Sequence, residues 1–328
     1  MSEPSPPAKR KRTDADVSQD QTPHRSKIWM PYGDIILQAE STQFRVNRDV
    51  LAKNSLVFQG MLTLPQPPDE AKIESCPIVQ LSDSAQDVEL LLSAFYDPFH
   101  HKAKLHFSVL AMSLRLGRKY EVLMFKSDAT SRMHFEFPTK LSDWDRRMAR
   151  NQLECIKPAS GIHVDLLNLA YENGVYTSIP SLAFHCLTLY TLLFIGVKRD
   201  DGSRATLPSD TKLTLALAME RLQIFQRNNF DRLREGYVFP FVDQCESPDE
   251  CEEEQRQMFR IECRRDHVDL SFTIGPWNKA GGGTWAGRLC ADCDKLAQAE
   301  YNVGRSKAWE TLPSFFGLGQ WKDLKDMD

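Results

Sequence analysis

The chain has 328 residues, of which 41% are hydrophobic and 26% are charged, and it carries a net charge of −4 at pH 7 with a pI near 6.1. This length and composition are sufficient to bury one large core or several smaller ones, as is typical of a soluble globular protein. The slightly acidic balance argues against nucleic-acid binding by the molecule as a whole, because nucleic-acid-binding domains are normally strongly basic.

Residues 1–27 have the composition of a disordered tail. They are rich in Ser, Pro and charged residues, and Val17 is their only branched aliphatic residue, so they are not expected to form a packed core. Within them "KRKR" (9–12) has the composition of a nuclear-import signal, although a solvated charge run has the same composition. Six Lys/Arg against four Asp/Glu give the tail a net charge of only +2 (6 − 4), too little for strong binding to DNA.

The sequence predicts an intracellular protein. No apolar segment that could act as a secretory signal follows the basic run, and the chain has no N-x-[ST] sequon. In a reducing compartment the eight cysteines are expected to be free thiols or metal ligands rather than disulfides. The expected location is the nucleus if the basic run is an import signal, and the cytoplasm otherwise.

An alternating pattern begins after residue 33. The segments "DIILQAE" (34–40) and "TQFRVNR" (42–48) place apolar side chains at every second position, which predicts two strands. The short polar turn between them indicates a β-hairpin, with Ile36, Phe44 and Val46 turned toward a core.

Helices then alternate with one more strand up to residue 138. The run "DVLAKNSLVFQGML" (49–62) has the apolar spacing of two short helices, with Asp49 and Ser55 as N-caps. Ser84 is placed to cap the next helix, which Pro98 ends. A third strand and two later helices are predicted at "IVQLSD" (78–83), "HFSVLAMSLRLGRKYEV" (106–122) and "LMFKSDATSRMHFEF" (123–137).

Six pieces of this region follow one another in an informative order: "GDIIL", "FRVNRDVLAKNSLVFQGML", "IVQLSD", "VELLLSAFY", "LGRKYEV" and the closing "FEFP". No single piece is specific, but the ordered series resembles the BTB/POZ domain, and the predicted domain covers residues 28–138. The resemblance implies a mixed α/β (α+β) interaction module that forms homodimers, hetero-oligomers or other partner contacts and has no catalytic activity.

By the same resemblance, Asp34 and Arg48 match a charged pair that lines the dimer groove in some BTB/POZ domains. They are therefore candidate interface residues. The alternative interpretation is a strand-end acid and a surface arginine without a shared role. Asn47 departs from the family pattern, which usually has a histidine there, but this departure affects no predicted element.

Residues 139–242 read as a mostly helical extension. Amphipathic helices are expected at "LSDWDRRMARNQL" (141–153), "HVDLLNLAYENGV" (163–175) and 209–233. The apolar window 182–197 falls short of the ~20 residues of a membrane span, so we expect a buried core helix there. This layout is similar to that of a large group of fungal BTB proteins, and "GRSKAWETLPSFFGLGQW" (304–321) resembles the end of that group.

Residues 243–328 form a unit rich in Cys and Trp. Cys290 and Cys293 have the C-x2-C spacing that lets two thiolates reach one tetrahedral ion, whereas Cys245 and Cys251 have a looser C-x5-C spacing. The motif "SPDE" (247–250) predicts a helix start that contains Cys251, and "CADCDKLAQAE" predicts another that contains Cys293. A helix N-terminus favours a thiolate.

The resulting hypothesis is a structural zinc ion held by Cys245, Cys251, Cys290 and Cys293, which would close the loop "GPWNKAGGGTWAGR" (275–288) between two helices. The alternative is that these are small buried residues, or one pair and two bystanders. Seven acids between residues 243 and 254 favour a cation but could equally form a solvated face. Cys263 and His267 are the substitute ligands if Cys245 lies too far away.

No enzyme motif stands out. The nearest approach to a phosphate-binding loop, "GGTWAGRL" (282–289), lacks the required Lys and Ser/Thr, and no nucleophile elbow or H-E-x-x-H is present. His100 and His101 are expected to be surface residues. A catalytic cysteine paired with His163 or His185 stays open, because such partners meet only in the fold. The aromatic C-terminus is expected to form a core rather than a platform for nucleic-acid bases.

The sequence therefore predicts a non-enzymatic interaction scaffold with protein partners, self-associating through the BTB/POZ domain as a homo- or heterodimer. The alternative is a substrate adaptor of a cullin-type ubiquitin ligase, for which the helical extension is compatible but no kelch-like repeat is present. Small-molecule substrates, membranes and nucleic acids are not expected partners. The only cofactor considered is the structural zinc.

Overall fold

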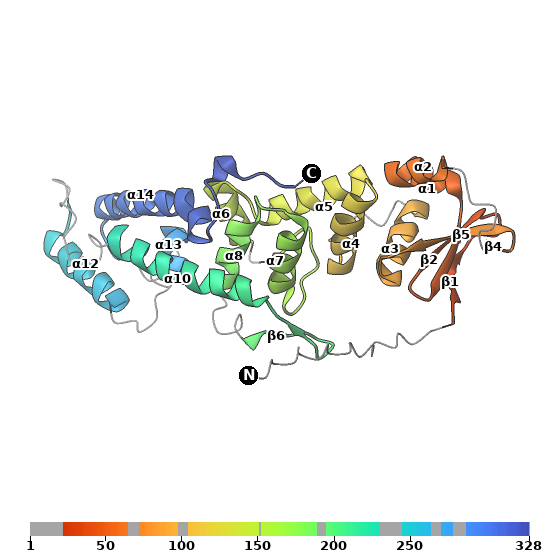
Figure 1. The fold of residues 1–328 in the computed structure, drawn as a ribbon. Helices are drawn as coiled ribbons and strands as arrows, with labels where there is room; N and C mark the ends of the chain where they lie inside the picture. Colours follow the sequence, from red (N-terminus) through yellow and green to blue (C-terminus); the bar gives the residue numbers. More distant parts are fainter. Residues whose placement is uncertain are drawn as a thin grey trace, which may run out of the picture. The chain divides into compact units, whose positions relative to one another are not determined.

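The computed structural model describes residues 22–64, 72–97, 104–150, 152–188, 195–229, 245–263, 270–277 and 287–327. Figure 1 labels their helices and strands. The described residues form two compact units, the first from those up to residue 54 and between 59 and 96, and the second from residues 55–58 and those from residue 97 onward. The predicted import run (9–12), His100 and His101 lie outside the described residues.

The first unit is built on a five-stranded mixed sheet of order β1-β3-β2-β5-β4. The predicted hairpin is confirmed, because β2 and β3 pair antiparallel, and the side chains of Ile36, Phe44 and Val46 are fully buried. β5 pairs parallel with β2, and β1 pairs parallel with β3. The strands are β1 (His24–Trp29), β2 (Ile35–Ala39), β3 (Thr42–Val46), β4 (Lys72–Ile73) and β5 (Cys76–Leu81).

The edge strand β1 corrects the predicted extent of the polar tail, which included residues 24–27. His24 N–H donates to the Ser41 carbonyl at 2.8 Å, and Lys27 forms an ion pair with Glu89 at 2.6 Å. Ile28 is the only residue of the strand that is buried. Charged edge strands are common because their charges prevent pairing with the strands of other chains. The same polar composition is typical of disordered segments, which is why the sequence analysis placed residues 24–27 in the tail.

Three helices accompany this sheet in the sequence: α1 (Arg48–Asn54), α2 (Leu56–Leu62) and α3 (Ala85–Tyr96). The cap at Ser84 is confirmed, since Asp87 N–H donates to its Oγ at 3.1 Å, and Ser55 Oγ likewise accepts from Phe58 N–H at 3.0 Å. The predicted cap Asp49 is wrong. It lies inside the first turn of α1, where an acid still favours the helix dipole.

The second unit has one large core that α4 to α8 share. Leu110 of α4, Met133 of α5, Leu166 of α7 and Leu182 of α8 are all buried in it. The core therefore does not divide at residue 138, where the sequence analysis placed a domain boundary. These helices are α4 (Phe107–Lys119), α5 (Leu123–Glu136), α6 (Leu141–Ala149), α7 (Ile162–Asn173) and α8 (Ile179–Leu187).

A close approach between α4 and α5 explains Gly117 in the "LGRKYEV" segment. A Cβ atom at this position would lie 3.0 Å from the backbone nitrogen of Lys126 and 3.3 Å from its Cα. A larger residue would push the two helices apart, because backbone atoms have no room to yield. The glycine thus fixes the spacing of two helices that are both part of the BTB-like series.

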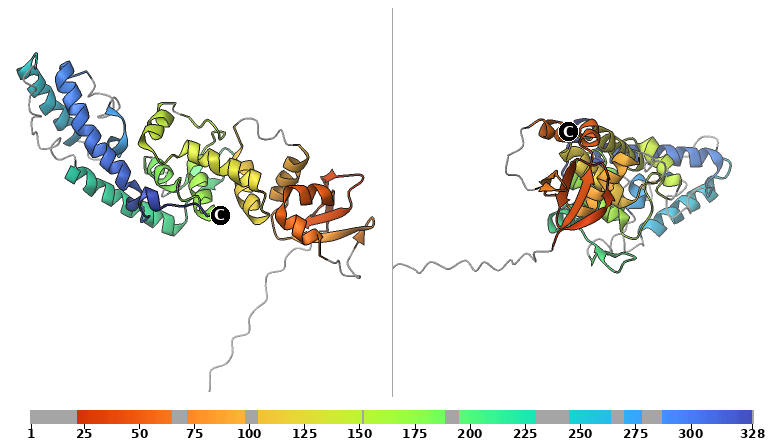
Figure 2. Two further views of the ribbon diagram at one scale, coloured as in Figure 1. Left: turned by 90° about the horizontal axis from the view of Figure 1, so that it is seen from above. Right: turned by 90° about the vertical axis from the view of Figure 1, so that its right-hand side faces the viewer.

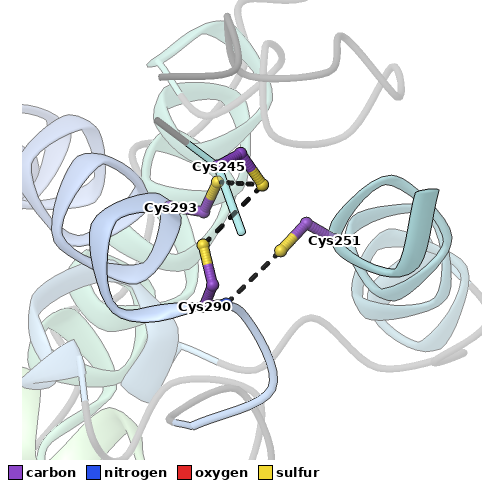
Figure 3. A group of neighbouring side chains, drawn as sticks. All are labelled: Cys245, Cys251, Cys290 and Cys293. Atoms are coloured by element: carbon purple, nitrogen blue, oxygen red, sulfur yellow. Dashed lines mark hydrogen bonds between the residues drawn. The ribbon is translucent and has the colours of Figure 1, made fainter. Parts of the chain in front are cut away.

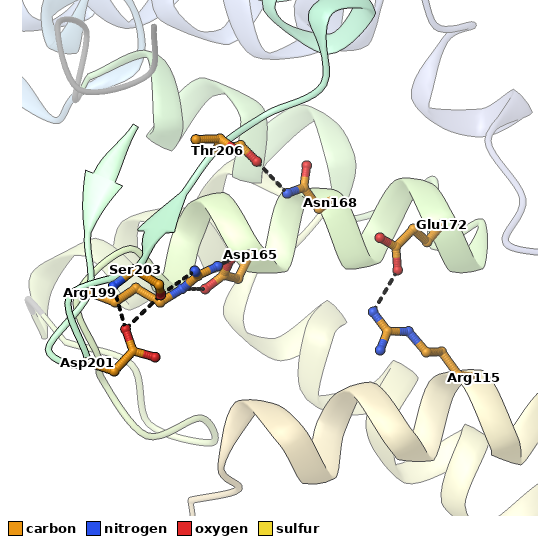
Figure 4. A network of polar contacts seen from close by, with 8 residues as sticks. All are labelled: Arg115, Asp165, Asn168, Glu172, Arg199, Asp201, Ser203 and Thr206. Carbon is orange, nitrogen blue, oxygen red and sulfur yellow. Dashed lines mark hydrogen bonds and ion pairs between the residues drawn. The ribbon is translucent and has the colours of Figure 1, made fainter. Parts of the chain in front are cut away.

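A small hairpin that the sequence analysis missed lies against α7 (Figure 4). It consists of β6 (Val197–Lys198) and β7 (Arg204–Ala205). Arg199 binds both carboxylate oxygens of Asp165, and Asn168 Nδ2 donates to the Thr206 carbonyl at 2.9 Å. Two-residue strands carry too little periodicity to be recognised from sequence.

The last helix, α14 (Ala291–Phe315), belongs to two hydrophobic clusters and lies beside α10 (Ser209–Asn229) (Figure 2). Trp309 and Phe315 in its second half pack into the large core, whereas Tyr301 in its first half packs into a smaller cluster with Trp277. The predicted units 139–242 and 243–328 therefore share a core. The remaining elements are α12 (Pro248–Cys263), α13 (Ser271–Ile274) and the 3-10 helix η3 (Trp321–Asp323).

Within the described ranges, no helix is both long enough and apolar enough to cross a membrane. The predicted core helix in the apolar window 182–197 is confirmed as far as Leu187, because nearly every residue of α8 is buried. Residues 189–194 of this window lie outside the described part of the chain. The predicted aromatic core is also confirmed for the described aromatics, since Trp309 is buried and its ring stacks on Trp321 at 5.4 Å.

Candidate functional site

The structure brings together the four cysteines that the sequence analysis chose as a metal site. Their sulfur atoms all lie within 4.8 Å of one another and point toward a common centre (Figure 3). Cys245 Sγ is 3.7 Å from Cys290 Sγ and 3.5 Å from Cys293 Sγ. A disulfide has a sulfur–sulfur distance of about 2.05 Å, so these are four separate thiols.

Two helix starts present these cysteines. Pro248 is the first residue of α12, and Cys251 N–H donates to the Ser247 carbonyl at 2.9 Å, which places Cys251 in the first turn as predicted. Cys290 is the N-cap of α14, and Cys293 lies in its first turn. The N-termini of two helices thus meet at the cluster, and each contributes partial positive charge.

The thiols differ in exposure and acidity. Cys251 and Cys293 are buried, and burial raises the pKa of both. The backbone N–H of Cys293, together with that of Glu246, lowers the pKa of the partly buried Cys290 to about 6, against the opposing effect of desolvation. Cys290 is thus the most readily ionised of the three at neutral pH.

Aromatic and charged side chains pack beside the cluster. Trp277 and Tyr301 lie with ring centroids 5.5 Å apart, and Trp277 Nε1 donates to Asp294 Oδ1 at 3.1 Å. Arg288 forms an ion pair with Glu254 at 2.6 Å, so part of the acidic run is neutralised by a neighbour. The side chains of the substitute ligands, Cys263 and His267, and residues 278–286 of the predicted loop lie outside the described residues.

The second predicted pair, Asp34 and Arg48, also meets in the structure. Asp34 Oδ1 accepts a hydrogen bond from the backbone N–H of Arg48 at 2.8 Å, and Arg48 Nε lies 4.0 Å from Asp34 Oδ2. Asp34 therefore caps α1 from a distant position in the sequence, in the place of the predicted cap Asp49. Both side chains of the pair reach solvent.

Beside this pair, the sequence analysis missed Tyr32 and did not predict the contacts of Asn47. Asn47 Nδ2 donates to the Tyr32 carbonyl at 3.0 Å, and Asn47 N–H donates to the Tyr96 hydroxyl at 3.0 Å. Tyr32 itself is 90% exposed. An aromatic residue in the polar turn "MPYGD" was the available signal, because a large exposed ring in a turn is unusual. We call Tyr32, Asp34 and Arg48 the α1-start surface.

Cys186, the cysteine next to the two histidines of the catalytic alternative, does not have the environment of a nucleophile. His163 and His185 do meet, with ring centroids 4.2 Å apart, and the neighbouring Cys186 is fully buried. The Cys186 thiol, however, donates to the His163 carbonyl at 3.5 Å, and burial raises its pKa. A nucleophilic cysteine needs the opposite environment, one that is accessible and favours the thiolate.

Comparison with known families agrees with the fold described above. A family model of the BTB/POZ domain matches residues 29–133, from β1 through most of α5. A search of curated proteins found no match to the chain. BTB/POZ domains are generally protein-interaction modules without enzymatic activity. The chain therefore contains a BTB/POZ domain, with its mixed sheet and helices, followed by a mostly helical C-terminal region.

Proposed function

We propose that this protein is a non-enzymatic interaction scaffold whose BTB/POZ domain self-associates. The observation that carries the proposal is the match of residues 29–133 to a domain that generally binds other proteins. The C-terminal region is compatible with it, because its buried apolar residues form a large core and its buried Arg147 holds two helices together through an ion pair with Glu136.

The α1-start surface is the proposed site of contact between two copies. Tyr32 offers a large ring that is 90% exposed, and it stands next to a capped helix start with a charged pair. Exposed aromatic residues and arginines are the side chains that contribute most to protein interfaces. Asp34 and Arg48 on one copy can pair with Arg48 and Asp34 on a second copy, which is the reciprocity that a two-fold symmetric dimer requires.

The test is the mass of the purified chain in solution as a function of concentration. Light scattering should give twice the 37.6 kDa chain mass at micromolar concentration. The variants Tyr32→Ser and Arg48→Glu should each weaken the dimer about tenfold or more, because loss of an interface anchor costs roughly 1–2 kcal/mol or more. Position 48 is the first residue of α1, where the helix dipole favours an acidic side chain, so this substitution is compatible with folding.

Lys53→Glu is the matched control, since it makes the same change of charge on an exposed residue in the last turn of α1. It should leave the dimer mass unchanged. A wild-type chain that stays monomeric at all concentrations would overturn the proposal. If both surface variants still form the dimer, the chain self-associates through a surface other than the α1-start surface.

A second candidate function is that of a cullin adaptor, for which exposed apolar residues provide an argument. Phe58 stacks on Tyr120 at 4.6 Å, and Ser55 Oγ donates to the Tyr120 carbonyl. Within a few residues of this contact, four apolar side chains are more than a third exposed, which favours a protein ligand. They are Leu56 (54%), Val57 (37%), Leu123 (65%) and Met124 (61%).

Co-purification from cells distinguishes the two functions. An adaptor should retain a cullin, and Leu123→Arg with Met124→Arg should abolish retention, whereas Val303→Arg, at a residue of α14 that is 69% exposed, should not. Protein partners without any cullin would support the scaffold alone. We further propose kinship with the fungal BTB group. We also propose import into the nucleus through residues 9–12, which is tested by imaging a tagged chain with those four residues replaced by alanine.

A further inference from the structure

We infer that Cys245, Cys251, Cys290 and Cys293 bind one zinc ion that fastens the start of α12 to the start of α14. This inference goes beyond the proposed interaction function, because it concerns a metal site in the C-terminal region. It rests on the donor set, the distances between the donors and the groups that surround them.

The donor set and the distances fit zinc. Four thiolates around a tetrahedral Zn²⁺ with bonds of about 2.3 Å have sulfur atoms roughly 3.8 Å apart. The observed distances from Cys245 Sγ are 3.7 Å and 3.5 Å, and all four sulfur atoms fall within 4.8 Å of one another. Four cysteine thiolates in a tetrahedron select zinc or iron–sulfur chemistry over magnesium or calcium, which prefer oxygen ligands.

The surroundings are arranged to stabilise negative sulfur. Cys290 N–H donates to Cys251 Sγ at 3.3 Å, so a backbone amide from one helix start already points at a sulfur of the other. The first turns of α12 and α14 add two helix dipoles with their positive ends at the cluster. Such contacts with the ligand sulfurs help to orient them and offset the charge of a four-thiolate site.

The chemistry of binding balances without any oxidant or reductant. The four thiols lose their protons to water, four zinc–sulfur bonds replace the zinc–water bonds of the hydrated ion, and the oxidation state of sulfur and zinc does not change. Binding therefore becomes weaker as the pH falls. Four protein ligands fill the tetrahedron and leave no position for a reactive water, which assigns the ion a structural role rather than a hydrolytic one.

The consequence for the fold is a cross-link between segments that are far apart in sequence. Cys245 and Cys251 are separated from Cys290 by about forty residues, yet they meet it at the cluster (Figure 3). Among the described residues, packing in this cluster involves a few buried apolar side chains, including Leu289, Ala297 and Tyr301. A bound metal adds most to the stability of the fold where the apolar cluster is small, because the burial of a few apolar side chains contributes little stability.

The test is the metal content of the full chain, purified with reductant and zinc, washed briefly with chelator, then unfolded and analysed for elements. The result expected is about one zinc per chain. Cys251→Ser and Cys290→Ser, one at each helix start, should reduce this content to a small fraction. Cys155→Ser, which changes a partly buried thiol outside the cluster, should retain it and serves as the matched control.

A second measurement on the wild-type chain covers the case in which the cysteine variants do not fold. Replacing zinc with Co²⁺ should give the intense visible absorption and sulfur-to-metal charge transfer of a tetrahedral cobalt–thiolate centre. Substantially less than one zinc per chain, iron in place of zinc, weak cobalt spectra typical of oxygen ligands, or folded cysteine variants that keep their zinc would each overturn the inference. None of these readouts depends on whether the BTB/POZ domain dimerises.

Discussion

The buried carboxylate of Glu136 connects three segments of the fold through its hydrogen bonds. Its side chain is fully buried at the end of α5, where one oxygen accepts from Arg147 Nε at 2.7 Å. The other oxygen accepts from the backbone N–H groups of Glu154 and Cys155, both at 2.6 Å. This role could not be predicted from the sequence, because the donors lie 11 to 19 residues away and only the fold brings them together.

Removal of this carboxylate should be strongly destabilising. We expect Glu136→Ala to lower the free energy of unfolding by roughly 3–5 kcal/mol, since Arg147 would remain buried without its partner. Glu172→Ala, which breaks an exposed ion pair with Arg115, should cost about 0–1 kcal/mol. Urea unfolding of both variants measures the difference, and equal midpoints would contradict the assigned role of Glu136.

At the scale of elements, helix starts were the most predictable features and short or polar strands the least. Ser55, Ser84 and the "SPDE" motif mark three helix starts that the structure confirms, because a cap is a local hydrogen bond between neighbours in sequence. The cap of α1 was mispredicted, since its acceptor is Asp34 and lies 14 residues away. Strand β1 was missed because Ile28 is its only buried residue, so its sequence shows no clear alternation of apolar and polar side chains.

The contact between α7 and α8 should make stability depend on pH. Burial, together with the positive charge of Arg147, lowers the pKa of His163 to about 4. Burial, together with the charges of His163 and Arg147, lowers the pKa of His185 to about 3. The unfolded histidines bind protons near pH 6.5, so stability is complete above that pH and falls as the pH drops below it. We expect a loss of roughly 1–2 kcal/mol per histidine between pH 7.5 and pH 5.

Urea unfolding at these two pH values checks this expectation. The double variant His163→Gln with His185→Gln should have a flatter pH dependence, because neither glutamine titrates in this range. His106→Gln, at an exposed residue, should keep the wild-type dependence and is the control. A double variant that loses as much stability as the wild-type chain would show that other groups are responsible.

At the scale of the whole molecule, the order of elements was predictable but the division of the core was not. The ordered series between residues 33 and 138 led to the correct domain, which the match of residues 29–133 confirms. The boundary at residue 138 followed from Pro138, which ends the last helix of the series, and a helix end does not report on how that helix packs. The structure brings the four cysteines together, and helix-start motifs in the sequence predicted the local positions of two of them, Cys251 and Cys293.

Truncation tests the shared core. A chain that ends at Pro138 would lose α7 and α8, and the buried faces of Leu114, Met133 and Phe137 would lose their contacts with the rest of the cluster. We expect this shorter chain to melt at a lower temperature than the full chain and to bind a hydrophobic dye. Equal melting temperature and no dye binding would show that α4 and α5 do not depend on the extension.

Self-association through the BTB/POZ domain is the central claim, and native mass spectrometry of the purified full-length chain tests it most directly. The predicted result is a dimer of 75.2 kDa, twice the chain mass of 37.6 kDa, that dissociates on dilution and is weakened by Arg48→Glu. A spectrum that contains only the 37.6 kDa monomer at micromolar concentration would contradict the claim.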